Sequence, residues 1–269
     1  MGTYRLTVEY DGSEFHGWQR QPALRTAEGE LRAALRRVVQ DDVELTAAGR
    51  IDAGAHAHGQ AVGVSLPREW PADRLRLALN AVLPRDVTVS AATAAPAGFH
   101  ARHDAVRRTY RYLVVPRRVP VARRFAWEVS GDLDLAAMRR GAEIFRGRHD
   151  FAAFGSSPRP GGTTVRTIAD ISVRRVSGLG GGEGFSAVVI EVGADAFLRG
   201  MMRGIAGALV ALGTGRLTSA ELAGSLDVSL TRPARATVAP ARGLHQWSVT
   251  YADAGSPDAP APSRGEAEG

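Results

Sequence analysis

The sequence contains no cysteine, which excludes disulfide bonds, thiolate metal sites and cysteine nucleophiles. It also has no apolar run near the roughly 20 residues that a membrane-spanning helix needs. Residues 1–10 begin directly on an alternating strand pattern, without the apolar segment and cleavage site of a signal peptide. We therefore expect a cytoplasmic protein with no membrane association, and the missing cysteine fits a reducing compartment.

Lysine is missing as well, so all 34 basic residues are arginine, against 28 acidic residues and a formal net charge of +6. Two explanations account equally well for the use of arginine in place of lysine: codon usage in a GC-rich genome, and a functional need for arginine. The excess of positive charge is the same under either explanation. Arginine presents a planar fork of donors that suits phosphate. A basic surface on a globular protein favours a polyanionic partner, nucleic acid first.

Hydrophobic periodicity predicts two successive sets of strands and helices. Tyr4, Leu6, Val8 and Tyr10 alternate as in a half-buried strand, and later segments repeat at helical spacing. In the first half, we predict strands at 3–10, 43–48, 60–66 and 87–93 and helices at 27–39 and 71–83. In the second half, we predict strands at 106–115, 125–129, 165–176, 185–192 and 246–251 and helices at 135–145, 197–212 and 219–226.

The order of these elements predicts an α+β protein built from two ferredoxin-like βαββαβ halves. The halves would comprise residues 1–98 and 99–252, with their antiparallel sheets side by side and a central active-site cleft between them. A chain of 269 residues is long enough for each half to bury a core. Residues 253–269, rich in alanine, proline, glycine, serine and glutamate, predict a disordered tail.

A glycine-rich loop, GRIDAGAHA at residues 49–57, holds the strongest candidates for chemistry. Arg50 and Asp52 are two residues apart, so their side chains point the same way if the backbone is extended. The glycines permit left-handed backbone and the close approach of a ligand. An aspartate beside an arginine in a loop is more often a structural ion pair than a catalytic group, and these residues alone leave both interpretations open.

Six segments, in order, resemble motifs of the TruA family of pseudouridine synthases. They are YDGSEFHGWQRQ (10–21), GRIDAGAHAHGQ (49–60), FHARHDAVRRTYRY (99–112), HDFAAF with VRTI (149–154 and 165–168), AFLRGMMRGIAG (196–207) and RGLHQW (242–247). The resemblance spans residues 4–251. It implies isomerisation of uridine to pseudouridine in the anticodon stem-loop of transfer RNA, at family positions 38, 39 and 40. It further implies a homodimer that needs no cofactor and no metal.

The resemblance also assigns expected roles to individual residues. Asp52 falls on the family's catalytic aspartate, whose carboxylate either attacks C1′ or removes a C2′ proton, and the sequence does not choose between these routes. Arg50 and Arg203 fall on arginines expected to orient Asp52 and keep it ionised. Tyr110 falls on the tyrosine that stacks on the target base. Leu244 falls on an apolar residue near that base, although a core leucine explains it almost as well.

Other classes of function are less well supported by the sequence. A non-catalytic RNA-binding module or RNA chaperone of the same fold would not need the carboxylate of Asp52. A metal-dependent nuclease would need an acidic cluster, which the sequence does not offer. His16, His56 and His58 lack the HExxH spacing and the cysteines of zinc sites, so we expect no metal.

Three residues depart from the family motifs within the matching segments. Ile51 stands where threonine is usual, Ala55 where valine is usual, and Gln246 where leucine is usual. None of these changes removes a charged or stacking residue. They therefore bear on substrate range and efficiency more than on the class of reaction.

The arginine-rich composition leads to a first prediction. If arginines supply most phosphate contacts, RNA binding releases counterions, and the logarithm of the affinity falls linearly with the logarithm of salt concentration. We expect a slope of about −0.7 to −0.9 per neutralised phosphate. Fluorescence anisotropy of labelled transfer RNA over a salt series measures it, and a flat response would contradict a basic RNA-binding surface.

Overall fold

The computed structural model describes residues 1–179, 185–226 and 237–252, and the tail predicted at 253–269 lies outside them. The described strands are β1 (Gly2–Tyr10), β2 (Leu45–Ala47), β3 (His56–Leu66), β4 (Val87–Ala94), β5 (Ala105–Val115), β6 (Trp127–Glu128), β7 (Gly147–Asp150), β8 (Val165–Leu179), β9 (Phe185–Ala194) and β10 (Leu244–Tyr251). The α-helices are α1 (Ala27–Val39), α2 (Ala72–Asn80), α3 (Leu135–Ile144), α4 (Met201–Gly213) and α5 (Ser219–Gly224). Short 3₁₀ turns form η1 (Gly12–Glu14), η2 (Pro120–Ala122) and η3 (Ala241–Gly243).

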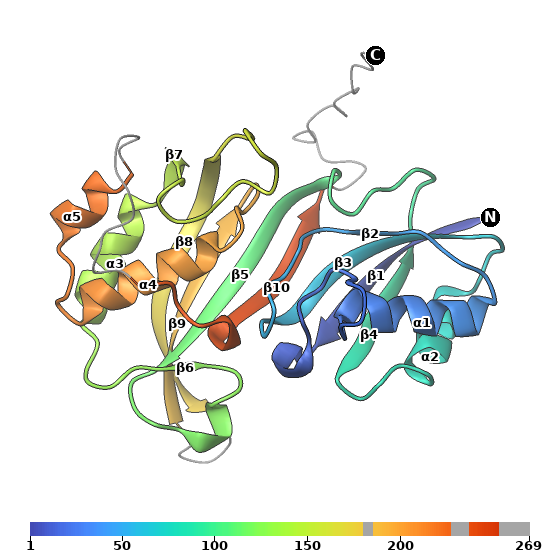
Figure 1. Ribbon diagram of the computed structural model, residues 1–269, viewed down its shortest axis with the longest axis horizontal. Helices are drawn as coiled ribbons and strands as arrows, with labels where there is room; N and C mark the ends of the chain where they lie inside the picture. Colours follow the sequence, from blue (N-terminus) through green and yellow to red (C-terminus); the bar gives the residue numbers. More distant parts are fainter. Residues whose placement is uncertain (180–184, 227–236, 253–269) are drawn as a thin grey trace.

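All ten strands belong to one sheet, in the order β4-β1-β3-β10-β5-β9-β8-β7, with β2 on β3 and β6 on β5. The predicted α+β class is confirmed, but a single sheet replaces the two separate sheets that we expected. The reason is β10, which pairs antiparallel with β5 along its whole length and parallel with β3 at two positions. Figure 1 shows β10 and β5 in the middle of the molecule, between β1–β4 and β7–β9.

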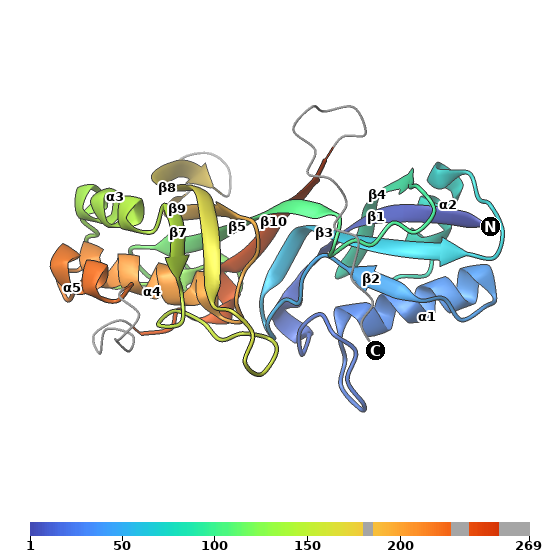
Figure 2. The same cartoon turned by 90° about the horizontal axis from the view of Figure 1, so that it is seen from above.

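Local sequence explains the elements of the N-terminal half. In β1, the alternate residues Tyr4, Leu6, Val8 and Tyr10 are buried, as period-two patterning requires. The first helix, α1, begins after Thr26, whose hydroxyl accepts a hydrogen bond from the Gly29 amide at 3.3 Å. The apolar residues of α1 and α2 join the same core cluster as the buried face of β1. Figure 2 shows α1 against this half of the sheet and α4 against the other.

Helix α4 is buried along nearly all its length, and it carries Arg203 in its first turn. It begins at Met201 instead of the expected residue 197. The residue before it, Gly200, has φ +75°, a left-handed conformation that glycine adopts without a steric penalty, so the helix cannot extend further back. The segment before α4 is therefore a loop, and this loop borders the cleft described below.

Other predicted boundaries also shift. Strand β3 starts at His56, four residues before the predicted start. Its first residues form part of the strand because they pair with β10 and with β1. Strand β7 was not predicted, because GRHD carries too short and too polar a pattern for periodicity to detect. The glycine-rich connection between β2 and β3 consequently shortens to residues 48–55.

Stacked histidines fill the seam between β3 and β10. The rings of His56 and His245 are buried, and their centroids lie 4.8 Å apart. The Gly12 amide donates to Nδ1 of His56 at 3.0 Å, so its proton lies on Nε2, which donates to the Arg124 carbonyl at 2.9 Å. The Nε2 atom of His245 lies 2.8 Å from the Phe125 carbonyl oxygen. Burial lowers the pKa of both histidines, that of His245 to about 3.

The seam predicts a pH dependence of stability. An unfolded histidine gains a proton near pH 6.5, whereas folded His245, with its pKa of about 3, does not. The unfolded state therefore binds more protons in this window, and the free energy of unfolding falls as pH drops below 6.5, by about 1.4 kcal/mol per pH unit for each such histidine.

In His245→Gln, the fall in the free energy of unfolding between about pH 7 and 5 should be shallower than in the parent protein. Urea unfolding at several pH values measures it. His103→Gln, at an exposed histidine, is the control and should keep the parent slope. An unchanged slope in His245→Gln would show that this residue is not buried in its neutral form.

Candidate active site

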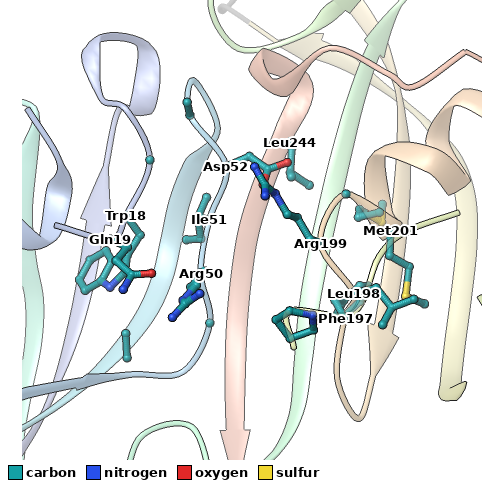
Figure 3. Close-up of a pocket in the computed structure, with 18 of the residues that line it drawn as sticks. Trp18, Gln19, Arg50, Ile51, Asp52, Phe197, Leu198, Arg199, Met201 and Leu244 are labelled. Carbon is teal, nitrogen blue, oxygen red and sulfur yellow. The ribbon is translucent and has the colours of Figure 1, made fainter. Parts of the chain in front are cut away.

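A cleft of about 1270 Å³ lies between the two halves and is lined by residues from both. Figure 3 shows Asp52 and Ile51 in one wall of this cleft, and Phe197, Leu198 and Met201 in the opposite wall. Five arginines line it against two carboxylates, so its charge is positive among the described lining residues. These charged residues are Arg50, Arg102, Arg108, Arg199 and Arg203, with Glu28 and Asp52.

The loop that carries Asp52 is held by the chain segment that follows β1. The Trp18 amide donates to the Ile51 carbonyl at 3.1 Å, and the Gly54 amide donates to the Phe15 carbonyl at 3.2 Å. A Cβ atom on Gly12 would lie 1.8 Å from the Ala55 carbonyl oxygen, so only glycine allows this approach. The YDGSEFHGWQRQ motif therefore acts as a support for the loop.

Asp52 forms an ion pair with Arg203 across the cleft. Nη1 of Arg203 lies 2.9 Å from Oδ2 of Asp52, and both side chains are about one-quarter exposed, at 26% and 24%. Nε of Arg203 donates to the Ala239 carbonyl at 2.7 Å, and this bond fixes the direction of the guanidinium. The carboxylate is thus paired, oriented and still reachable from the cleft.

Arg50 does not share this ion pair. Its side chain is exposed, no ion pair joins it to Asp52, and Figure 3 shows it directed away from that carboxylate. The expectation that alternation brings Arg50 and Asp52 together assumes extended backbone. Residues 49–52 belong to no strand, so alternation does not fix the directions of these side chains, and a turn closed by the Ala55 amide donating to the Asp52 carbonyl at 3.2 Å follows.

Tyr110 and Leu244 both border the cleft. Tyr110, in β5, is 7% exposed and packs edge-on against Phe197, with ring centroids 4.6 Å apart. Burial raises the pKa of Tyr110, with a smaller contribution from the negative charge of Asp52, so its hydroxyl remains protonated. Leu244, 5% exposed, begins β10. Tyr112 is fully buried, and its hydroxyl donates to the Pro240 carbonyl at 2.6 Å.

Three further residues of the cleft escaped the sequence analysis. They are Arg108, Phe197 and Arg199. A signal existed for Arg108, because it shares the buried, even-numbered face of β5 with Tyr110 and Tyr112. No periodicity marks Phe197 and Arg199, since they lie in the loop before α4.

The three departures from the family motifs all lie in buried positions. Ile51 is 5% exposed and belongs to the hydrophobic core cluster, although it also borders the cleft. Ala55 is 1% exposed and packs beside η1. Gln246 is fully buried in β10, and its amide has no hydrogen-bond partner within the described part of the chain.

No three histidine, aspartate or glutamate side chains in residues 1–179, 185–226 and 237–252 come together as metal ligands would. In the same ranges, no helix has the length and apolar character needed to cross a bilayer.

The chain is similar to proteins of known families over almost its whole length. The family model described as tRNA pseudouridine synthase matches residues 6–104 and 142–252, which include Asp52, Arg203 and Leu244, whereas Tyr110 lies between the two stretches. A protein of Methylobacterium nodulans named tRNA pseudouridine synthase A is 41% identical over 257 residues, covering 94% of this chain and 98% of its own. Proteins of the same name from Chlorobium phaeovibrioides and Acetivibrio thermocellus are each 36% identical, covering 93% of this chain and all of theirs.

The chain therefore belongs to the tRNA pseudouridine synthase family. The resemblance noted in the sequence motifs is confirmed, and with it the prediction of an isomerase that acts on transfer RNA. The interpretation as a non-catalytic RNA-binding module is not favoured.

The position of Ile51 leads to a prediction about its replacement. Ile51→Thr keeps a β-branched side chain, so the loop backbone is retained, but it places a hydroxyl at a buried position of the core. We expect a loss of about 1–3 kcal/mol in the free energy of unfolding. Turnover should change less than tenfold, which corresponds to about 1.4 kcal/mol in barrier.

Chemical denaturation and steady-state kinetics on the same preparation measure both effects. Ile51→Val, which adds no polar group, is the matched control and should be the more stable variant. A hundredfold gain in turnover for Ile51→Thr at unchanged stability would show instead that a hydroxyl at this position acts in the reaction.

Proposed function

We propose that the protein isomerises uridine to pseudouridine in the anticodon stem-loop of transfer RNA, at positions 38, 39 and 40, with Asp52 as the catalytic carboxylate and without cofactor or metal. The observation that carries this proposal is the ion pair of Asp52 with Arg203, 2.9 Å long, in a positively charged cleft. Family membership supports the reaction, and the geometry supports the choice of residue.

The reaction breaks the N-glycosidic bond of uridine and rejoins the base to C1′ through carbon. A carboxylate serves either as the nucleophile at C1′ or as the base that removes the C2′ proton, and both routes remain open. Either route needs an ionised and oriented carboxylate close to the sugar. Arg203 orients this carboxylate, because its guanidinium is tied to the Ala239 carbonyl and presents Nη1 to Asp52.

The target nucleotide must leave its stack to reach Asp52. We assign Tyr110 and Leu244 to the target base, because both border the cleft on the side of β5 and β10. Tyr110 would stack on the base and Leu244 would pack against it. Arg50 is exposed on the rim of the cleft, so we assign it to the RNA backbone or the extruded nucleotide in place of a direct contact with Asp52.

We extend the proposal to architecture and assembly. Residues 1–98 and 99–252 would be two ferredoxin-like halves, and the order β4-β1-β3 with β2 on β3 supports this for the first half. The two separate stretches matched by the family model support a division into halves. Following the family resemblance, the protein would act as a homodimer on transfer RNA in the cytoplasm.

The distribution of charge in the cleft favours this reaction over metal-dependent cleavage of RNA. A nuclease of that kind holds its ions with several carboxylates at one site. The two carboxylates among the described lining residues are instead paired with arginines, Asp52 with Arg203 and Glu28 with Arg32. An arginine-neutralised aspartate is suited to a reaction in which the carboxylate itself acts on the sugar.

Replacement of Asp52 tests the proposed function. Asp52→Asn and Asp52→Ala should lose at least a hundredfold in turnover, about 2.7 kcal/mol in barrier, while still folding and binding transfer RNA. Pseudouridine mapping of transfer RNA after incubation with purified protein measures turnover and shows which positions are modified. Asp42→Asn, at an exposed aspartate, is the charge-matched control and should be fully active. Substantial isomerisation by either Asp52 variant would overturn the assignment.

A further inference from the structure

Arg108 occupies an unusual position beneath the cleft. It lies in β5 two residues before Tyr110, on the same face of the strand, and it is only 8% exposed. Arginine is rarely buried to this extent without a carboxylate partner. No ion pair within the described part of the chain includes Arg108.

Backbone carbonyls take the place of a carboxylate. Nη1 of Arg108 donates to the carbonyls of Ala105 at 2.9 Å and Asp195 at 2.7 Å. Nη2 donates to the Arg102 carbonyl, and Nε and Nη2 share the Ala48 carbonyl at 3.4 Å. One planar guanidinium therefore binds four backbone carbonyls from three stretches of chain, at residue 48, residues 102–105 and residue 195, a geometry that the single ammonium group of lysine does not reproduce.

Two of these segments carry the walls of the cleft. Ala48 is the first residue after β2, in the loop that carries Asp52, and it lies four residues before Asp52 in the chain. Asp195 precedes the loop that holds Phe197 and leads into α4, where Arg203 lies. The Asp195 carboxylate does not approach Arg108 as an ion pair but accepts hydrogen bonds from the Thr167 amide at 3.1 Å and the Ala196 amide at 2.6 Å. Arg108 thus links the segment before Asp52 to the segment before Arg203.

The positive charge of Arg108 persists in this setting. Burial lowers the pKa of Arg108, but a guanidinium starts so high that it stays protonated in proteins. Since the carbonyls carry only partial charges, they leave a net positive charge beneath Tyr110, where low polarity strengthens its field.

We propose that Arg108 is a positioning residue for the isomerisation, which sets the separation of Asp52 and Arg203 by holding the Ala48 and Asp195 carbonyls together. This inference rests on the proposed role of Asp52. It goes beyond that role because it predicts that the fork of hydrogen bonds, and not the charge alone, is needed for turnover.

Arg108→Lys separates these two contributions, because it keeps the charge and loses the fork. We expect kcat to fall at least tenfold, while the Kd for transfer RNA stays within threefold of the parent value. Single-turnover kinetics and anisotropy measure the two constants, and circular dichroism with thermal melting confirms that the variant is folded. A general loss of structure would change both constants, whereas loss of positioning changes kcat alone.

Arg107→Lys is the matched control. Arg107 is the adjacent residue on the opposite face of β5, where it pairs with Asp170 with both side chains 39% exposed, and its variant should keep parent values of kcat and Kd. A folded Arg108→Lys with kcat within twofold of the parent would overturn the proposal and leave Arg108 as a structural support. Asp52→Asn, measured in parallel, reports separately on the proposed function, because it removes the carboxylate and leaves Arg108 and its hydrogen bonds in place.

If Arg108→Lys does not fold, the Asp195 carboxylate offers a second test. Asp195→Ala removes the acceptor for the Thr167 and Ala196 amides and so loosens the segment whose carbonyl binds Arg108. Asp195→Asn retains an acceptor oxygen. A tenfold lower kcat in Asp195→Ala at unchanged Kd, with recovery in Asp195→Asn, would support the proposal. Equal, parent-like kcat in both variants would overturn it.

Discussion

The site depends on a short parallel pairing between β3 and β10. Two residue pairs, His245 with His56 and Gln246 with Ala57, connect the N-terminal half of the sheet to the C-terminal half. Asp52 lies four residues before this seam, and Leu244 lies immediately before it in β10. Pairing the strands therefore brings the Asp52 loop against β5 and α4. The neutral, stacked histidines belong to this constraint, because they tie the seam to the Arg124 and Phe125 carbonyls.

Hydrogen bonds from backbone amides and from two arginine side chains together hold the walls of the cleft in place. Backbone amides of the segment after β1 hold the Asp52 loop from one side, and the buried Arg108 guanidinium holds its approach from the other. Arg203 then meets Asp52 with its own direction set by the Ala239 carbonyl. These donors are satisfied by backbone oxygens or by Asp52 itself, so the site is organised before RNA binds and the Asp52 carboxylate needs little rearrangement.

The arginines of the cleft serve two different purposes. Arg108 and Arg203 are anchored to backbone oxygens or to Asp52, and they organise the protein itself. Arg50, Arg102 and Arg199 are exposed and have no carboxylate partner within the described residues, so they are available to phosphates. An RNA substrate would therefore meet two kinds of arginine. The free guanidinium groups would attract its phosphates, and the charge-paired centre would define where the target nucleotide is placed.

The sequence by itself determined the family, the α+β class, most helices and strands, and the position of Asp52, because motif order and hydrophobic periodicity are properties of neighbouring residues. Only the tertiary structure decided that the two halves share one sheet, that Arg203 rather than Arg50 pairs with Asp52, and that Arg108 binds backbone carbonyls from distant stretches of chain. The Asp52–Arg203 pair spans 151 residues of chain, and no local pattern encodes a contact formed by the pairing of β10 with β3.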